Sequence, residues 1–290
     1  MTTSDMFREH LVRSGDGLML YARDYGPINA HPPLVCLAGL TRNSRDFHHF
    51  ALALSSEATQ PRRVITIDTR GRGRSQWDED KSRYSVPVEA GDVLTVCAAL
   101  GIEHADFMGT SRGGLIMHVL AAVRPDIMRS AILNDVGPAI GTGGLALIQS
   151  YLRQRSVFAN LDQVAVALKL VHGEAFPTLG SDDWRDFAEA TYVKSAGGYE
   201  PDHDPAIAEA MAGLDLTQPL PELWDQFQVL ATKPLMTIRG ENSLLLTPEI
   251  LETMKRKAAS MKVIDVAGQG HAPILHLAGL PEKIAAFLRT

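Results

Sequence analysis

Short, continuous apolar runs alternate with segments of helical spacing along most of this chain. Apolar runs lie at residues 34–38, 64–67, 106–108, 130–133, 235–238 and 262–266, and helical spacing occurs at residues 47–54, 88–100, 111–123, 248–256 and 281–288. Strands without polar alternation are typical of a parallel sheet that helices cover on both faces. The alternation therefore predicts an α/β fold with a mostly parallel central sheet flanked by helices, preceded by a hairpin at residues 7–25.

One long segment interrupts this alternation. Between residues 137 and 228, helical spacing occurs at residues 145–153, 161–171 and 184–193, and no segment has the pattern of a strand. We therefore expect a core formed by residues 1–136 and 229–290, with residues 137–228 inserted as a helical cap (lid) above the carboxyl edge of the sheet. A cap in that place would exclude water and shape a pocket for a small, largely apolar substrate.

Composition excludes several classes of protein. The 290 residues are 45% hydrophobic and 21% charged, which excludes a disordered chain. The net charge of −6 leaves no basic excess for binding a nucleic acid. No apolar stretch approaches the ~20 residues of a membrane-spanning helix, and the first ten residues lack the apolar segment of a signal peptide. We expect a cytoplasmic monomer or homodimer that acts on a small molecule, with no membrane or nucleic acid partner.

The chain offers no pattern for a metal or a nucleotide cofactor. Two cysteines, Cys36 and Cys97, are too few for a disulfide framework or a four-ligand zinc site. The glycine-rich segments at residues 71–75 and 141–144 lack the spacings that bind phosphate groups. The Asp-His-Asp cluster at residues 202–204 is expected to be a solvated loop and not a set of metal ligands. No cofactor and no metal are expected.

Residues 109–113 read Gly-Thr-Ser-Arg-Gly and lie between a predicted strand and a predicted helix. In a nucleophile elbow, this placement lifts the serine above the sheet on a sharp turn, where a base can reach its hydroxyl. Glycines two residues before and after the serine are needed because larger side chains would collide in so tight a turn. The helix that begins here directs N–H donors toward an oxyanion. The pattern predicts Ser111 as a nucleophile.

Five segments, in order, make the chain resemble the α/β-hydrolase family over nearly its full length. They are Leu-Ala-Gly-Leu at 37–40, Asp-Thr-Arg-Gly-Arg-Gly-Arg-Ser at 68–75, Gly-Thr-Ser-Arg-Gly-Gly at 109–114, Arg-Gly-Glu-Asn at 239–242 and Gly-Gln-Gly-His at 268–271. The resemblance implies the α/β-hydrolase fold and a catalytic triad. It implies that His271, in the loop after the last predicted strand, is the base. It also implies an oxyanion hole formed by the backbone N–H groups of Leu40 and Arg112.

The third member of the triad departs from the family pattern. The family usually has an aspartate in the loop after the penultimate strand, where this chain has Leu244, which cannot accept a hydrogen bond from an imidazole. Asp135 follows the strand predicted at residues 130–133, at the same carboxyl edge, and Glu241 lies in the usual loop a few residues early. We predict Asp135 as the acid and Glu241 as the alternative, because the carboxylate must reach the far nitrogen of His271.

These residues predict a serine hydrolase that cleaves a small, largely apolar carboxylic ester or lactone through an acyl-enzyme. The same groups could serve carbon–carbon bond hydrolysis or acyl transfer, and a ligand-binding protein with a degenerate acid position stays open because of Leu244. Dehalogenase and epoxide hydrolase chemistry would need an aspartate in place of Ser111. Among the other polar residues, Arg42 and Arg45 are expected to be solvated, and His118 is expected to pack inside its helix.

Overall fold

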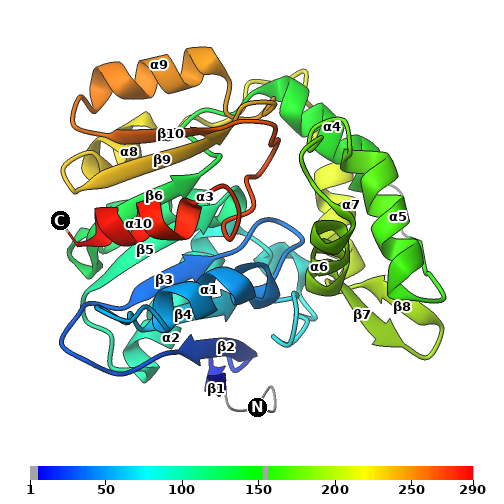
Figure 1. Ribbon diagram of the computed structural model, residues 1–290, viewed down its shortest axis with the longest axis horizontal. Coiled ribbons are helices and arrows are strands. Elements are labelled where there is room, and N and C mark those ends of the chain that lie inside the picture. The colour runs from blue at the N-terminus through cyan, green and yellow to red at the C-terminus, as the bar shows by residue number, and fades with distance from the viewer. Residues whose placement is uncertain (1–5, 153–155, 290) are drawn as a thin grey trace.

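The computed structural model describes residues 6–152 and 156–289, and its helices lie on both faces of one large sheet (Figure 1). The strands are β1 (Phe7–Arg13), β2 (Met19–Tyr25), β3 (Leu34–Leu37), β4 (Val64–Asp68), β5 (Ala105–Thr110), β6 (Met128–Asn134), β7 (Tyr192–Ser195), β8 (Gly198–Pro201), β9 (Leu235–Gly240) and β10 (Lys262–Val266). The α-helices are α1 (His48–Ser55), α2 (Val86–Ala99), α3 (Arg112–Val123), α4 (Thr142–Leu152), α5 (Leu161–His172), α6 (Ser181–Thr191), α7 (Pro205–Ala212), α8 (Trp224–Leu230), α9 (Pro248–Lys257) and α10 (Leu280–Leu288). Short 3₁₀ helices lie at η2 (Ser44–Phe47), η3 (Lys81–Arg83) and η4 (Pro125–Ile127).

The sheet has eight strands in the order β1-β2-β4-β3-β5-β6-β9-β10. The pairs β1–β2 and β2–β4 are antiparallel, and every other pair is parallel. The predicted mostly parallel sheet and its N-terminal hairpin are confirmed. Because β4, β3, β5, β6, β9 and β10 run in one direction, the loops that follow them meet along one edge, which is where ligands bind in open α/β sheets.

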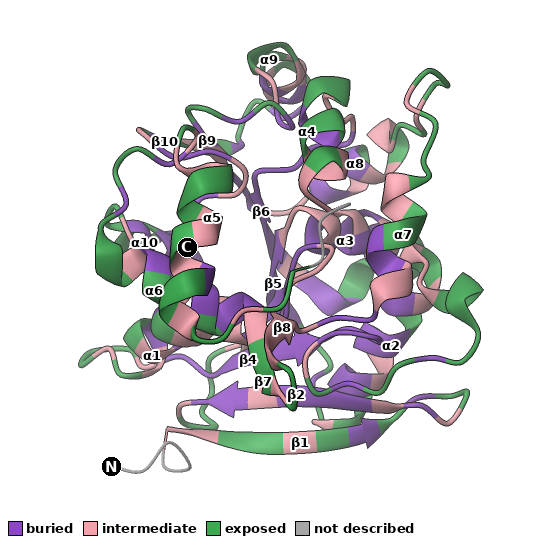
Figure 2. Ribbon diagram, turned by 90° about the vertical axis from the view of Figure 1, so that its right-hand side faces the viewer, coloured by how far each residue is buried: buried purple, intermediate pink, exposed green. Residues whose placement is uncertain are grey.

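Two apolar cores, one on each face of the sheet, explain why the strands have no polar alternation. Val35 and Leu37 of β3 face the core built with α2, α3, α8 and α9, whereas Leu34 and Cys36 face the core built with α1 and α10. Figure 1 shows α1 and α10 in front of the sheet and α3 and α8 behind it. Figure 2 shows the inner strands buried and β1, at the edge, largely exposed. None of the helices in the described part of the chain is long and apolar enough to cross a membrane.

Between β6 and β9 the chain forms α4 to α7 and the hairpin β7–β8, which together we call the insertion. It lies beside the sheet-bearing part, at the right of Figure 1. It has a small apolar cluster of its own, formed by Phe176, Leu179 and Trp184. Helix α8 differs, because it packs on α3, and Phe227 lies in a sheet core. These contacts favour a boundary before Trp224, and not at residue 229.

The prediction that this segment contains no strand is wrong. Strands β7 and β8 have four residues each and pair with one another, with one further bridge from Tyr199 to Phe158. Their side-chain alternation is too short to distinguish from a loop. The helix predicted at 184–193 ends at Thr191, because Tyr192 is already extended, with φ −112° and ψ 152°. The end predicted at Arg153 for the preceding helical segment lies outside the described residues.

Residues 202–204 form a junction between the two parts, so the predicted solvated loop is also wrong. The Gly73 N–H donates to the Asp202 carbonyl at 3.0 Å, and the Asp204 N–H donates to the Gly71 carbonyl at 2.8 Å. The Asp204 carboxylate accepts from the Tyr84 hydroxyl at 2.6 Å and caps α7 through the Ala206 N–H. These hydrogen bonds satisfy polar groups of residues 202–204 that the sequence alone led us to expect in solvent.

His118 makes the free energy of unfolding depend on pH. It is fully buried on α3, with Nδ1 2.7 Å from the Gly114 carbonyl, which confirms the predicted packed position. Burial lowers the pKa of His118 from 6.5 to about 4. The unfolded chain therefore takes up a proton here below pH 6.5 that the folded chain binds only near pH 4.

We expect this group to cost the folded state about 1.4 kcal/mol per pH unit as the pH falls from 6.5 toward 4. Urea unfolding of wild type and His118→Leu at pH 7 and pH 5 measures the effect, and the variant should lose less stability on acidification. His31→Gln, at an exposed position, is the control. Equal pH dependence in His118→Leu and wild type would contradict the prediction.

Candidate active site

Ser111 lies on the sharp turn between β5 and α3. Its backbone has φ 52° and ψ −118°, a conformation that is rare for a residue other than glycine. A Cβ atom on Gly109 would lie 2.5 Å from the backbone of Gly113, and one on Gly113 would lie 2.1 Å from the Leu37 carbonyl. The predicted need for glycine at both positions is therefore confirmed. The turn carries the serine hydroxyl out of the sheet, at its carboxyl edge.

His271 reaches Ser111 from the loop after β10. Its Nε2 lies 2.8 Å from Ser111 Oγ. Side-chain amides hold this loop: Asn134 donates to the Pro273 carbonyl at 3.1 Å, and the Gln269 side chain accepts from the Ile274 N–H at 2.7 Å. The structure thus brings together two predicted residues that are separated by 160 positions in the chain.

Asp135 follows β6 and has no exposed surface. Its Oδ2 lies 2.7 Å from His271 Nδ1 and accepts from the Ser243 hydroxyl at 2.6 Å, and its Oδ1 accepts from the Gly240 N–H at 2.9 Å. An ionised carboxylate can only accept hydrogen bonds, so Nδ1 of His271 carries a hydrogen. Nε2 is then free to accept from the Ser111 hydroxyl.

Neither Leu244 nor Glu241 approaches His271 in this way. Leu244 is 55% exposed, and its side chain has no atom that could accept a hydrogen bond from the imidazole. Glu241 accepts from the Gly268 N–H at 2.8 Å and so secures the base of the loop that carries His271. Of the two carboxylates considered from the sequence, Asp135 is the one within hydrogen-bond distance of the imidazole.

Ser243 and Gly240 are functional contacts that the sequence analysis did not single out. Both donate to Asp135, and a Cβ atom on Gly240 would lie 2.3 Å from the Gly270 carbonyl, so only glycine lets the two loops approach. Ser243 lies next to Leu244 in the loop where the family's aspartate is expected. In the sequence, this hydroxyl next to Leu244 is the feature that could have indicated a contact with the acid of the triad.

The backbone N–H groups predicted for the oxyanion hole belong to segments adjacent to Ser111. Leu40 lies after β3, where a Cβ atom on Gly39 would be 3.7 Å from Ser111 Cβ, and Arg112 begins α3. Within residues 6–152 and 156–289, neither the Leu40 nor the Arg112 N–H donates to another residue. Two unpaired N–H groups beside a serine can receive a developing negative charge.

A cavity of about 530 Å³ opens over Ser111 and His271. The insertion lines it with mostly apolar and aromatic side chains: Ile148, Tyr151, Leu152, Leu168, His172, Phe176, Leu179 and Phe187. Burial raises the pKa of Tyr151 to about 12 and lowers the pKa of His172 to about 4, so both are neutral at pH 7. The cavity has the size and lining of a small-molecule site.

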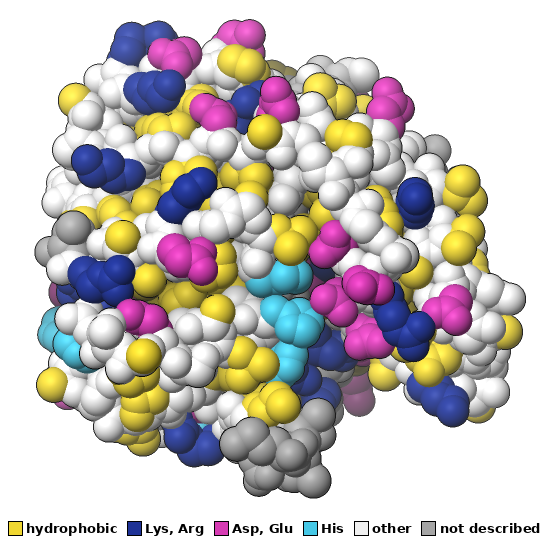
Figure 3. All heavy atoms as spheres, in the orientation of Figure 1, with side chains coloured by type: hydrophobic (Ala, Val, Ile, Leu, Met, Phe, Trp, Pro, Cys, Tyr) yellow, Lys and Arg dark blue, Asp and Glu magenta, His cyan; other side chains and the backbone are white. Residues whose placement is uncertain are grey.

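Charged side chains gather where the insertion meets the sheet-bearing part. Figure 3 shows histidines beside acidic side chains on this face, and His49 Nε2 lies 3.3 Å from Asp186 Oδ2 across the junction. Arg42 and Arg45 were expected to be solvated, but both are half-buried and paired with acidic side chains. Arg42 binds Asp46 and lies over the Phe187 ring of the insertion, 4.2 Å from its centroid. Arg45 also reaches the insertion. Arg45 Nη1 donates to Asp202 at 2.6 Å.

Among the described residues, no group of three or more histidine, cysteine, aspartate or glutamate side chains is arranged to hold a metal ion.

A parallel sheet covered on both faces, with a serine, an imidazole and a carboxylate in contact at its carboxyl edge, is the architecture of the hydrolytic α/β enzymes. Comparison with known proteins agrees: the chain belongs to the alpha/beta hydrolase fold family, whose model matches residues 32–276.

Two relatives that match most of the chain are named hydrolases. The chain is 32% identical to a 3-hydroxybutyrate-oligomer hydrolase of Cupriavidus necator, over 83% of this chain and 82% of the relative. It is 29% identical to a 2-(acetamidomethylene)succinate hydrolase of Mesorhizobium japonicum, over 92% and 90%. The crystal structure of an alpha/beta hydrolase from Novosphingobium aromaticivorans superposes with a TM-score of 0.89 at 33% identity, covering 98% of each chain.

Proposed function

We propose that this α/β hydrolase is a serine hydrolase that cleaves a small, largely apolar carboxylic ester or lactone through an acyl-enzyme. One observation carries the proposal: Ser111 Oγ, the His271 imidazole and the Asp135 carboxylate form a continuous chain of contacts of 2.8 and 2.7 Å. A serine hydroxyl becomes a useful nucleophile only when a base of this kind accepts its proton.

In the first step, His271 Nε2 takes the proton of Ser111 as Oγ attacks the carbonyl carbon of the substrate. The carbonyl oxygen becomes an oxyanion, which accepts hydrogen bonds from the Leu40 and Arg112 N–H groups. The intermediate collapses, its bond to the alcohol oxygen breaks, and His271 returns the proton to the leaving alcohol. Asp135 orients the imidazole and stabilises its positive charge.

In the second step, His271 takes a proton from a water molecule, whose oxygen attacks the acyl carbon. The bond to Ser111 Oγ breaks, the proton goes back to Oγ, and the carboxylic acid leaves. Each turn of this cycle consumes one water molecule and restores the enzyme.

The substrate class is inferred from the cavity. We propose that residues 137–228, apart from the start of α8, act as a cap that excludes water and shapes the pocket. A volume of about 530 Å³ and a mostly apolar lining suit a short or medium acyl chain better than a polymer. The names of the two relatives, one acting on 3-hydroxybutyrate oligomers and one on an acylated succinate derivative, are consistent with small carboxylic substrates.

Covalent labelling tests the proposed nucleophile. A p-nitrophenyl alkylphosphonate should transfer its phosphonyl group to Ser111 Oγ, with p-nitrophenolate leaving and His271 accepting the serine proton. We expect one equivalent of p-nitrophenolate per chain, a mass increase confined to the peptide that contains Ser111, and loss of activity toward p-nitrophenyl esters in step with labelling. Modification of another residue, or labelled protein that keeps its esterase activity, would contradict the proposal.

A further inference from the structure

Glu89 on α2 is a buried carboxylate to which the reaction above gives no role. It has no exposed surface, and two arginines converge on it. Arg72 Nη1 lies 2.7 Å from Oε1, and Arg112 donates through Nε to Oε2 at 2.8 Å and through Nη2 to Oε1 at 3.0 Å. A buried carboxylate is retained in such a place only when its partners satisfy it.

One of the two arginines, Arg112, itself supplies the first proposed oxyanion donor. The Arg112 N–H is the proposed donor at the start of α3, and two of the three side-chain nitrogens of the same residue, Nε and Nη2, donate to Glu89. Its Nη2 also donates to the Tyr84 carbonyl at 3.0 Å. The direction of the backbone N–H at a helix start depends on how firmly this first turn is held.

The other arginine, Arg72, contacts Leu40, the residue that supplies the second proposed donor. Arg72 Nε donates to the carbonyl of Leu40 at 2.8 Å while Nη1 of the same guanidinium binds Glu89. Arg72 is fully buried, so this bridge has no competition from water. This hydrogen bond restrains Leu40, a residue that lines the cavity and whose N–H is the proposed second donor.

We propose that Glu89 is a positioning residue of the oxyanion hole: through Arg72 and Arg112, one carboxylate holds in register the two segments that supply the N–H donors. This assignment rests on the proposed function. The donors come from the loop after β3 and from the start of α3, and each N–H is otherwise unpaired within the described residues. Two guanidinium groups share one carboxylate, so the cluster keeps a net positive charge, which favours an oxyanion nearby.

The test is Glu89→Gln, which keeps the size of the side chain but replaces one acceptor oxygen with an NH₂ group that cannot accept from an arginine. The experiment measures kcat/KM and, separately, the affinities of two inhibitors. A trifluoromethyl ketone adds Ser111 Oγ to its carbonyl carbon and forms an oxyanion, whereas the alcohol obtained by reducing that ketone cannot. We expect kcat/KM and ketone affinity to fall together by about tenfold to a hundredfold, with alcohol affinity within about threefold of wild type.

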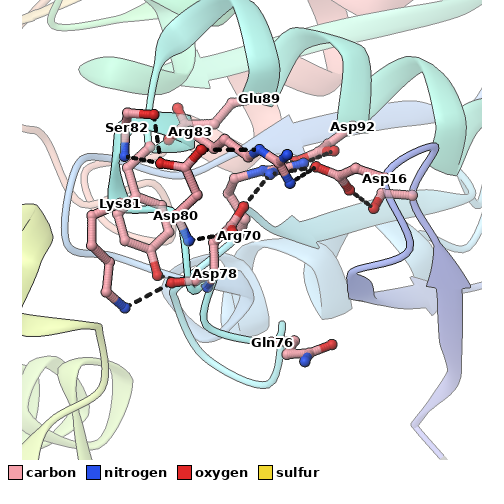
Figure 4. Close-up of polar contacts among 12 residues, drawn as sticks. Asp16, Arg70, Gln76, Asp78, Asp80, Lys81, Ser82, Arg83, Glu89 and Asp92 are labelled. Atoms are coloured by element: carbon pink, nitrogen blue, oxygen red, sulfur yellow. Dashed lines mark hydrogen bonds and ion pairs between the residues drawn. The ribbon is translucent and has the colours of Figure 1, made fainter.

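Asp92→Asn is the matched control. Asp92 lies one turn further along α2, is also buried, and also accepts two hydrogen bonds from a buried arginine, Arg70, both at 2.7 Å (Figure 4). Arg70 continues to Asp16 and Asp78, away from both N–H donors. This variant should lose stability as Glu89→Gln does, and keep kcat/KM and ketone affinity within about threefold of wild type.

Unchanged ketone affinity in Glu89→Gln, or equal losses in Asp92→Asn, would overturn the assignment. If Glu89→Gln does not fold, as judged by circular dichroism, Arg112→Met serves instead: it removes one arm of the bridge and should lower kcat/KM and ketone affinity by about tenfold. An Arg112→Met variant with the kcat/KM and ketone affinity of wild type would also overturn the assignment. Failure of the proposed function is distinguishable, because wild type would then release product no faster than Ser111→Ala.

Discussion

Replacing Ser111 with alanine is expected to lower kcat for p-nitrophenyl ester hydrolysis by about 10⁶-fold, the loss that follows removal of the nucleophile in a serine protease. Alanine lacks only the Oγ atom, so His271 keeps its contact with Asp135 while nothing remains to attack the carbonyl carbon. The backbone conformation at φ 52° is as unusual for alanine as for serine, so the free energy of unfolding should change little. Steady-state kinetics and urea unfolding measure the two effects.

Ser130→Ala is the control for loss of a buried serine. Its hydroxyl donates to Asp106 at 2.6 Å inside the sheet, near the start of β6 and away from the cavity. We expect this variant to lose stability and to keep kcat. If Ser111→Ala hydrolyses the esters as fast as wild type, the protein does not use Ser111 as a nucleophile, and the reading as a ligand-binding protein becomes the better one.

Replacing Asp135 with asparagine is expected to lower kcat by about 10⁴-fold, the loss seen when a serine protease loses this carboxylate. Asparagine keeps the volume of a fully buried side chain, and its oxygen can still accept from the Gly240 N–H. Its NH₂ group then faces His271 Nδ1 and favours the tautomer with a hydrogen on Nε2. That tautomer cannot accept the proton of Ser111.

Glu241→Gln is the matched control, since it makes the same change in the loop where the family usually has its acid. Glu241 contacts the Gly268 N–H, and glutamine can still accept that hydrogen bond. Its kcat should stay within about threefold of wild type, because the side chain does not touch the imidazole. A Glu241→Gln enzyme that loses activity, beside an active Asp135→Asn enzyme, would show that the acid is Glu241.

The sheet could be predicted because its strands are buried on both faces. Runs such as 64–67 and 235–238 are mostly apolar and are buried at every position, and such runs leave few alternatives once helical segments separate them. The hairpin of β7 and β8 could not be predicted in the same way, because each strand has only four residues and all of them are exposed or half-buried. The packing of α8 on α3, which favours an earlier return to the core, could not be predicted from so short a helix of seven residues.

For some site residues the neighbouring sequence is enough to predict their position, and for others it is not. Ser111 depends on neighbouring glycines and on a strand and a helix adjoining it in the chain, so its turn can be recognised locally. The choice between Asp135 and Glu241 depends on which of the two side chains lies close to the His271 imidazole. His271 is more than a hundred residues away from Asp135 in the chain. Residues 202–204 were misjudged for the same reason, because their partners at residues 71 and 73 lie far back in the chain.

By itself, the sequence determined the fold class and the turn that carries Ser111, and its resemblance to the family indicated a histidine in the last loop. The fold class and the turn follow from periodicity and from short-range steric limits, which act between residues close in the chain. Only the tertiary structure decided that Asp135 contacts His271, that Ser243 and Gly240 donate to that carboxylate, and that Glu89 joins two arginines. Those contacts form across separate strands and helices, and hydrogen bonds depend on distances and directions that packing alone sets.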